Sequence, residues 1–441
     1  MRWRGSGLVL AVLLVAACAG APSTASPSPA ATAVASPTNE VAVARRADLE
    51  QLLERLDAIH RNPFLDEGET AFRARVDAVA DRAAGRSDAG FLVDVMGLMG
   101  HRDRDGHSGA WAMAQTGDRL HARPLWLREF PDGLRVVTAR APFEDLVGAI
   151  VTAVGGTPID VARRTVTPLV PADNDSNRRA NLPMYLLLPE VVEELGIQRP
   201  GASALSLRLP HGSAADVDPE PLPIDTYRDW IFGVYPSYPT AMPPDEDGSR
   251  ERRRRDEPFW TEMLPDGTLY VAYHEVRSKS GDVTIGRLAN EVDAVDGPVI
   301  VDMRANPGGD NTTYGPFRDA LRRKAAGGAG QLALLTSRDT FSAAGNFVTE
   351  LKVGKHGDRI LLVGEPPGGG LNIYGDVATV TLEESGIVVL ISGDYHEKAP
   401  GDDRLQIEPD VPVEASWDDV VAGRDPVLDA ALAAMAEGTE P

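Results

Sequence analysis

The sequence predicts a layered α/β domain that follows a helical region and a small β-rich domain. Three observations support this prediction. Leucines recur at three- and four-residue steps near the start, as in Leu49, Leu52 and Leu56. Short β-type runs separated by glycine turns occupy residues 117–225. From residue 267 onward, strand-like and helix-like segments alternate, which is the pattern of a layered α/β domain.

Composition excludes several classes of protein. The 441 residues include 44 Lys and Arg against 66 Asp and Glu, a formal net charge of −22. A nucleic-acid-binding protein needs a basic surface, so this balance argues against one. The single cysteine excludes a disulfide framework and Cys-based zinc or iron–sulfur sites. No His, Cys and Asp set has ligand spacing, so we expect no metal and no cofactor.

The N-terminus has the pattern of an export signal. Arg2 and Arg4 precede the apolar run Leu8–Val15, which is too short to span a bilayer. Small residues then lead to Cys18, and this resembles a bacterial lipoprotein processing site. We expect a signal peptide at 1–17, lipidation of Cys18 and an Ala/Pro/Ser/Thr tether at 18–44. The protein would then sit on the outer face of the membrane, held through its lipid anchor; the alternative is plain secretion.

The segments after the tether differ in character. An N-terminal helical region is expected at 45–115, with Ser87 as a candidate N-cap. Within 116–225, the runs Leu134–Ala139 and Ala149–Val154 with Gly155-Gly156 resemble part of a PDZ domain, a peptide-binding module; an unrelated β domain is the alternative. Prolines and mixed charges at 226–262 predict a linker with a solvated loop.

The α/β domain is expected at 263–436. Its expected strands are 269–276, 299–303, 332–335, 360–363 and 387–391, and its expected helices are 317–325, 343–353 and 427–435.

Four motifs lie at strand ends of this domain, where α/β proteins usually carry their chemistry. Asp302-Met303-Arg304-Ala305-Asn306-Pro307-Gly308-Gly309 is a strand-turn whose glycines let backbone amides face an anion. Thr340-Phe341-Ser342-Ala343 places a serine at a helix start, as an N-cap or as a nucleophile. The turn 364–370 and the segment 409–426, which ends in Gly-Arg-Asp-Pro, follow later strands.

Together with Asp105-Gly106-His107 upstream, these motifs resemble the tail-specific (C-terminal processing) serine peptidases, in their tricorn-protease-like branch. The resemblance covers 265–435 firmly and 45–225 more loosely. It implies a layered crotonase/ClpP-like core. It also implies Ser342 as the nucleophile and an oxyanion hole from the amides of Gly308 or Gly309 and of Ala343.

The choice of general base separates the branches of this family. One branch uses a lysine about 25 residues after the serine, where this chain has Gly368-Gly369-Gly370. The tricorn-like branch uses a histidine, which implies His107, with His274 as a rival. The resemblance further implies a carboxylate that orients the base: Glu397 is the expected group and Asp402 its rival. This chain also lacks the glutamate that often follows Ser-Ala.

The expected function is a serine endopeptidase acting on polypeptide substrates through an acyl-enzyme. Two alternatives remain. One is an inactive relative that binds peptides in the cell envelope. The other is a crotonase-like acyl-CoA enzyme, against which the export signal argues. The sequence does not determine the natural substrate or the oligomeric state.

Overall fold

The computed structural model describes residues 37–65, 67–100, 104–234, 248–328 and 330–438. The expected signal peptide, Cys18 and most of the expected tether lie outside these residues. Within them, no helix combines the length and apolar character needed to cross a bilayer.

Three helices form the N-terminal region: α1 (Pro37–Ile59), α2 (Glu69–Ala83) and α3 (Asp88–Gly100). Residues 37–44, expected to belong to the tether, are instead part of α1. Glu40 lies in its first turn, where a negative charge is favourable, and Ala and Glu are good helix formers. Leu49, Leu52 and Leu56 are buried, as their spacing predicts.

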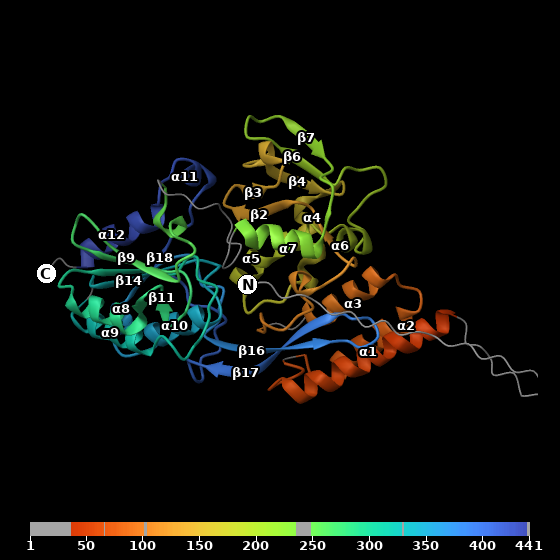
Figure 1. The fold of residues 1–441 in the computed structure, drawn as a ribbon, viewed down its shortest axis with the longest axis horizontal. Helices are drawn as coiled ribbons and strands as arrows, with labels where there is room; N and C mark the ends of the chain where they lie inside the picture. The colour runs from red at the N-terminus through yellow and green to blue at the C-terminus, as the bar shows by residue number, and fades with distance from the viewer. Residues whose placement is uncertain (1–36, 66, 101–103, 235–247, 329, 439–441) are drawn as a thin grey trace, which may run out of the picture.

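The middle of the chain is built on an antiparallel sheet of order β2-β3-β4-β6-β7, with β5 paired to β4. Its β-type runs match the expected ones, but helices that the sequence did not reveal pack beside them (Figure 1). The elements are η1 (Ala112–Ala114), β1 (His121–Ala122), β2 (Leu125–Phe130), β3 (Gly133–Ala139), η2 (Glu144–Leu146), β4 (Ile150–Val154), β5 (Thr157–Pro158), α4 (Ile159–Val166), η3 (Thr167–Leu169), α5 (Asp175–Tyr185), α6 (Pro189–Glu194), β6 (Leu205–Arg208), β7 (Ala214–Val217), β8 (Leu222–Pro223) and α7 (Ile224–Val234).

The expected linker at 226–262 contains more structure than its composition suggested. Most of α7 falls in it, and Tyr227 and Ile231 of this helix are fully buried. Arg252 is only 5% exposed, so this part of the predicted solvated loop is packed against the protein. Strand β9 (Phe259–Met263) also begins inside this span, before the expected start of the α/β domain.

The C-terminal third forms the expected layered α/β unit. Its sheet has the order β18-β15-β14-β13-β10-β9, parallel except for β9, which runs antiparallel to β10. The elements are η4 (Arg250–Arg252), β9, β10 (Leu269–Tyr273), β11 (Lys279–Ser280), β12 (Val283–Thr284), α8 (Ile285–Ala294), β13 (Val299–Asp302), α9 (Gly315–Ala326), β14 (Leu332–Thr336), α10 (Ala343–Lys352), η5 (Gly357–Arg359), β15 (Leu361–Gly364), β16 (Asn372–Thr381), β17 (Val388–Glu397), β18 (Val411–Pro412), α11 (Trp417–Val421) and α12 (Pro426–Gly438).

Two apolar layers cover this sheet. Alternate strand residues such as Val299 and Val301 pack with α8, α9 and α10, while Ile300 packs with α12. Successive side chains of a strand point to opposite faces, so strands buried on both sides are apolar throughout. The Thr340–Ala343 motif therefore follows a central strand, β14, whose residues 332–336 are all buried.

A long hairpin joins the two parts of the molecule. Strands β16 and β17 leave the α/β unit and reach helix α1, as Figure 1 shows. Asp48 of α1 accepts hydrogen bonds from the amides of Glu384 and Ser385 in the hairpin turn, at 2.9 and 2.8 Å. Further back, Leu390 of β17 exchanges backbone hydrogen bonds with Gly109. The hairpin thus brings the segment around His107 to the α/β unit.

Candidate active site

Ser342 stands on a sharp turn between β14 and α10. Its backbone has φ 55° and ψ −126°, a region that residues other than glycine rarely adopt. Although Ser342 occupies the N-cap position, its side chain caps no amide of the helix. The capping interpretation is therefore wrong, and the hydroxyl is available for another partner.

That partner is His107, in the loop between α3 and Gly109, the residue that pairs with Leu390 of β17. Its Nε2 lies 2.9 Å from Ser342 Oγ. The imidazole also stacks on Phe341, with ring centroids 4.4 Å apart. For Nε2 to accept the hydroxyl proton, the ring must carry its own proton on Nδ1. This is the geometry by which a histidine activates a serine.

Burial keeps His107 uncharged at neutral pH. Desolvation is the largest effect and lowers the pKa of the imidazole to about 4; the charges of Asp105 and Asp376 act in the opposite direction, and His396 acts with desolvation. The Nδ1 atom is buried and has no hydrogen-bond partner among the described residues. The ring can thus accept a proton at neutral pH without first losing one.

Backbone amides converge beside the hydroxyl. A Cβ on Gly308 would lie 2.6 Å from Ser342 Cβ and 3.0 Å from Ala343 N, so only glycine allows this approach. The Gly308 amide donates to Asn306 Oδ1 at 2.9 Å. The structure shows no acceptor for the Gly309 amide among the described residues, and Ala343 opens α10, where amides have no partner within the helix. The amides of Gly309 and Ala343 thus have no acceptor among the described residues and can receive an oxyanion.

The turn that carries these amides is fixed by side chains of the motifs. Asn306 is fully buried and donates through Nδ2 to the Tyr273 carbonyl at 2.7 Å. The backbone carbonyl of Asn306 accepts a hydrogen bond from the Phe341 amide. Thr340 Oγ1 donates to the Met303 carbonyl at 2.8 Å. The glycine turn and the serine turn are therefore held together before any ligand arrives.

A cavity of about 520 Å³ opens beside the Ser342–His107 pair. Its lining is largely apolar and comes from both halves of the chain. The apolar side chains include Trp111, Met113, Trp126, Met184, Phe232 and Leu390. A cavity of this size and character accommodates a large apolar side chain next to the hydroxyl.

The structure does not bring the expected orienting carboxylates to His107. Glu397 ends β17 as an exposed side chain and lines a separate polar cavity of about 210 Å³ together with Asp402. Asp402 pairs with Arg404 at 2.6 Å. The Ser392 side chain of the same strand donates to Asp105 in the His107 loop, but Glu397 is an odd number of residues away and so points to the opposite face.

The rival base His274 has other contacts. Its Nδ1 lies 3.2 Å from the Glu257 carbonyl, and its ring packs edge-on against Trp260. Burial lowers its pKa to about 4, as for His107. Among the described residues, His274 makes no contact with Ser342, so His107 is the histidine that pairs with the serine.

The structure shows contacts of buried groups around the histidine loop for which the sequence predicted no role. Asp105 accepts from Ser108 and Ser392 and lies 3.0 Å from His60 Nε2. Asp173 accepts from the Gly106 amide at 2.6 Å. The Asp-x-His spacing could have pointed to Asp105. Neither His60 nor Asp173 lies in a distinctive motif, because their partners are far away in the sequence.

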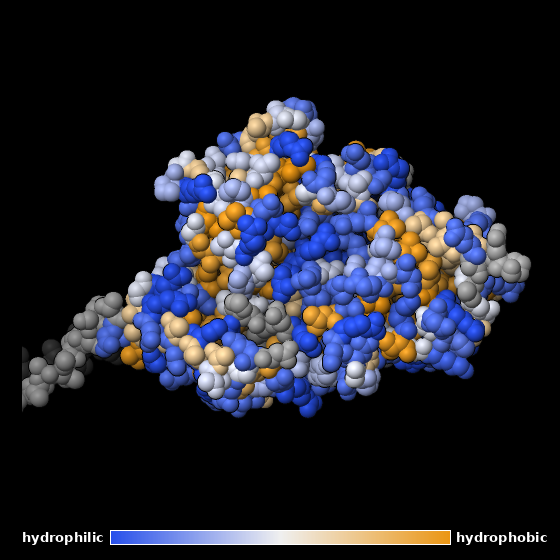
Figure 2. Space-filling model, turned by 180° about the vertical axis from the view of Figure 1, so that it is seen from behind, coloured by the Kyte–Doolittle hydropathy of each residue, from blue (hydrophilic) through white to orange (hydrophobic). Residues whose placement is uncertain are grey.

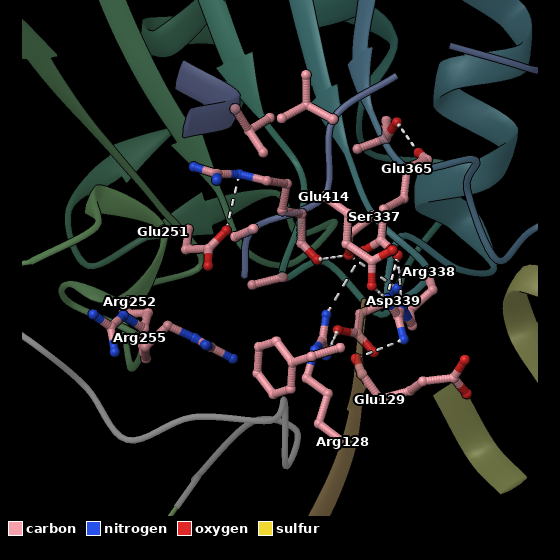
Figure 3. A pocket seen from close by; sticks show the side chains of 17 residues that line it. Arg128, Glu129, Glu251, Arg252, Arg255, Ser337, Arg338, Asp339, Glu365 and Glu414 are labelled. Carbon is pink, nitrogen blue, oxygen red and sulfur yellow. Dashed lines mark hydrogen bonds and ion pairs between the residues drawn. The ribbon is translucent and has the colours of Figure 1, made fainter. Parts of the chain in front are cut away.

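Charged side chains also anchor the loop before Ser342 (Figure 3). Arg338 is 1% exposed and donates to Glu365 and Glu414, and to the Glu129 carbonyl at 3.1 Å. Asp339 accepts from Arg128 of β2 at 2.5 Å. The loop before Ser342 is therefore held to the antiparallel sheet as well as to its own unit.

Comparisons with known proteins place the fold. No protein-family model and no curated protein matches the chain. Among solved structures, mature CPAF aligns over 91% of this chain and 99% of its own, with 13% identity and a TM-score of 0.60. Mature CPAF complexed with lactacystin aligns over 90% and 100%, with 12% identity and a TM-score of 0.60. The chain shares the fold of CPAF.

A photosystem II D1 C-terminal processing protease is a more distant neighbour. It aligns over 84% of this chain and 93% of its own, with 15% identity and a TM-score of 0.38. The CPAF likeness extends over nearly the whole of both chains, so the helical region, the antiparallel sheet and the α/β unit all belong to the shared fold.

Proposed function

We propose that the protein is a serine endopeptidase of the tail-specific family, in its tricorn-like branch. One observation carries this proposal: the 2.9 Å contact between Ser342 Oγ and His107 Nε2. Residues 235 positions apart in the sequence meet in hydrogen-bond geometry beside amides that can hold an oxyanion.

The chemistry follows from this geometry. Ser342 Oγ attacks the carbonyl carbon of a peptide bond while its proton passes to His107 Nε2. The carbonyl oxygen, now negatively charged, is held by the amides of Gly309 and Ala343. His107 then gives the proton to the departing amine, leaving an acyl-enzyme on Ser342. A water molecule, activated by the same imidazole, releases the acid and restores the serine.

The substrate class follows from the cavity. Its tryptophan, methionine and phenylalanine side chains favour an apolar residue next to the cleaved bond. The antiparallel sheet is proposed to act as the PDZ-like module that presents extended polypeptides by strand addition. Both assignments make unstructured protein, rather than folded protein, the expected substrate.

Replacement of Ser342 tests the activity. Purified protein should hydrolyse an unstructured protein and should be labelled on Ser342 by a fluorophosphonate, and Ser342→Ala should abolish both. Unchanged hydrolysis in the variant would reject the nucleophile. Binding of peptides without hydrolysis or labelling would instead support the inactive, peptide-binding alternative.

The location of the protein is a separate proposal. We propose export and lipidation at Cys18, with the tether lifting the folded part off the outer face of the membrane. Cells that express the full chain should incorporate labelled palmitate into it, and Cys18→Ala should release the protein into the soluble fraction. Release of the unaltered chain would favour plain secretion.

A further inference from the structure

The loop that carries His107 is fixed by a buried carboxylate, Asp105. Its Oδ1 accepts from the Ser108 amide at 3.0 Å and from Ser392 Oγ at 2.8 Å, and its Oδ2 lies 3.0 Å from His60 Nε2. We propose that Asp105 is a positioning residue for His107 and that His60 holds Asp105 in place. This inference rests on the proposed function, because it assigns a role in the same reaction.

The contacts of His60 define which nitrogen carries its proton. The Asn62 amide donates to His60 Nδ1 at 3.0 Å, so this nitrogen supplies a lone pair. The proton is therefore on Nε2, which donates to Asp105. Neither side chain has any exposed surface, and the His60 ring packs against Tyr374 with centroids 4.5 Å apart. The pair is thus locked in one orientation.

The same carboxylate joins two distant parts of the chain. Ser392 belongs to β17 of the hairpin, and its amide donates to Ser108 Oγ at 2.9 Å. Ser108 Oγ donates in turn to Ser392 Oγ at 3.1 Å. His60 directly follows α1. Asp105 therefore fixes the loop against both the helical region and the hairpin, on the N-terminal side of His107.

This arrangement supplies the orientation that a direct carboxylate contact would otherwise give. His107 Nδ1 has no partner among the described residues, and Glu397 lines another cavity. The charged groups that act on the ring are Asp105 from its own loop, Asp376 from β16 and His396 from β17. Asp105 therefore contributes position through the backbone and, through space, a negative charge that favours the imidazolium.

Asp105→Asn tests the proposal with little change in shape. The amide nitrogen introduced at position 105 would face the Nε2 proton of His60, so two hydrogen-bond donors would point at each other. We expect kcat to fall about 100-fold with KM unchanged, the loss typical of a misplaced catalytic group. Fluorophosphonate labelling of Ser342 should slow in parallel. Removal of the charge should also move the acid limb of the kcat/KM profile to lower pH, measured by brief pH-jump assays.

A second substitution provides a rescue. His60→Gln in the Asp105→Asn background can turn its amide oxygen toward the side-chain amide introduced at position 105 and restore a donor–acceptor pair. We expect about 10-fold recovery of kcat, because the loop regains its position. The acid limb should stay at the lower pH, because the charge is still absent. A purely structural role would not separate these two readouts.

Asp48→Asn is the matched control. Asp48 is a buried aspartate that holds the same hairpin, but at the turn formed by Glu384 and Ser385. The Asp48→Asn substitution should lower the melting temperature without moving the acid limb.

An Asp105→Asn enzyme with unchanged labelling rate and unchanged acid limb would overturn the positioning role. Full hydrolysis by Ser342→Ala would instead overturn the proposed function itself, so the two failures are distinguishable.

Discussion

At the scale of single residues, the environment of His107 determines the pH range of the proposed reaction. The general base must be neutral, and burial lowers its pKa to about 4. A histidine in water would lose activity below about pH 6.5. We therefore expect kcat/KM to stay high at pH 5 and to fall to half near pH 4, measured with a fluorogenic peptide between pH 3.5 and 8. A midpoint near 6.5 would contradict the buried, neutral imidazole.

Asp173 leads to a prediction about stability. It is buried, and desolvation raises its pKa to about 8, although the Gly106 and Gly370 amides act against that rise. In the unfolded chain the carboxyl has a pKa of about 4. Between about pH 4 and about pH 8 the folded state therefore keeps a proton that the unfolded state releases. Stability falls as pH rises through this window.

Asp173→Asn should remove this part of the pH dependence. An asparagine oxygen can still accept from the Gly106 amide, but it does not titrate. We expect the melting temperatures of the variant and the original protein to be close at pH 5 and the variant to be the more stable at pH 8. Asp175→Asn, at a neighbouring aspartate whose side chain is 91% exposed, is the control and should leave the slope unchanged.

Single residues also show how far the sequence alone could lead. Ser342, His107 and the glycine turn were identified from short motifs, and the structure brings them together. The expected orienting group, Glu397, lies on the face of β17 opposite the Ser392 side chain, because the two residues are an odd number of positions apart. Asp105, in the Asp-x-His motif itself, was within reach of the sequence. His60 and Asp173 carry no local signal; their roles arise from contacts with residues 45 and 67 positions away.

At the scale of the elements, the strand–turn–helix at Ser342 holds an unfavourable backbone conformation. A φ of 55° is easily adopted by glycine and costs other residues about 1 kcal/mol or more. Ser342→Gly and Ser342→Ala both remove the proposed nucleophile, but only glycine adopts this backbone conformation without strain. We expect Ser342→Gly to have the higher melting temperature of the two.

A helical position nearby provides the contrast. Ala344 lies within α10 and is fully buried, so Ala344→Gly should lower the melting temperature, as glycine does inside helices. Equal melting temperatures for Ser342→Gly and Ser342→Ala would show that the turn relaxes at no cost. The strain would then play no part in presenting the hydroxyl.

Ion pairs between the elements connect the motifs of the α/β unit. Arg304 of the first motif is buried against Asp302 and pairs with Asp425 of the last motif at 2.8 Å. Glu365 of the third motif pairs with Arg338, just before Ser342. The strands of the α/β unit were predictable from their apolar runs. The β16–β17 hairpin was predictable only in part: the expected strand 387–391 covers part of β17, and β16 was not expected. The turn of the hairpin contacts Asp48 of α1, 336 positions before Glu384, and local sequence carries no signal of such a contact.

At the scale of the molecule, the acidic surface and the buried ion pairs have different roles. Figure 2 shows hydrophilic side chains across much of the rear face, with hydrophobic areas between them. The formal net charge is −22, and ion pairs exposed on such a surface are individually weak. The pairs between the antiparallel sheet and the loop before Ser342 are mostly shielded from solvent, so they have a larger influence on how the two parts fit together.

The Arg128–Asp339 pair allows this influence to be measured. Its side chains are 16% and 10% exposed, and it links β2 to the loop before Ser342. Arg128→Met leaves the Asp339 carboxylate near the interface without its partner, which is costly. Asp339→Asn leaves Arg128 with only its longer, 3.9 Å pair with Glu365. We expect each to lower the free energy of unfolding, and the double variant to lose less than the sum. The coupling should be about 1 kcal/mol or more, within the range for contacting residues.

The exposed pair Arg254–Glu257 is the matched comparison, with side chains 51% and 37% exposed. The same cycle there should give about 0.5 kcal/mol or less, and that coupling should vanish in about 1 M salt. The Arg128–Asp339 coupling should persist, because solvent and ions have little access to it. If both couplings were small and equally sensitive to salt, the sheet would not hold the loop before Ser342 through charge, and apolar packing alone would have to join the two parts.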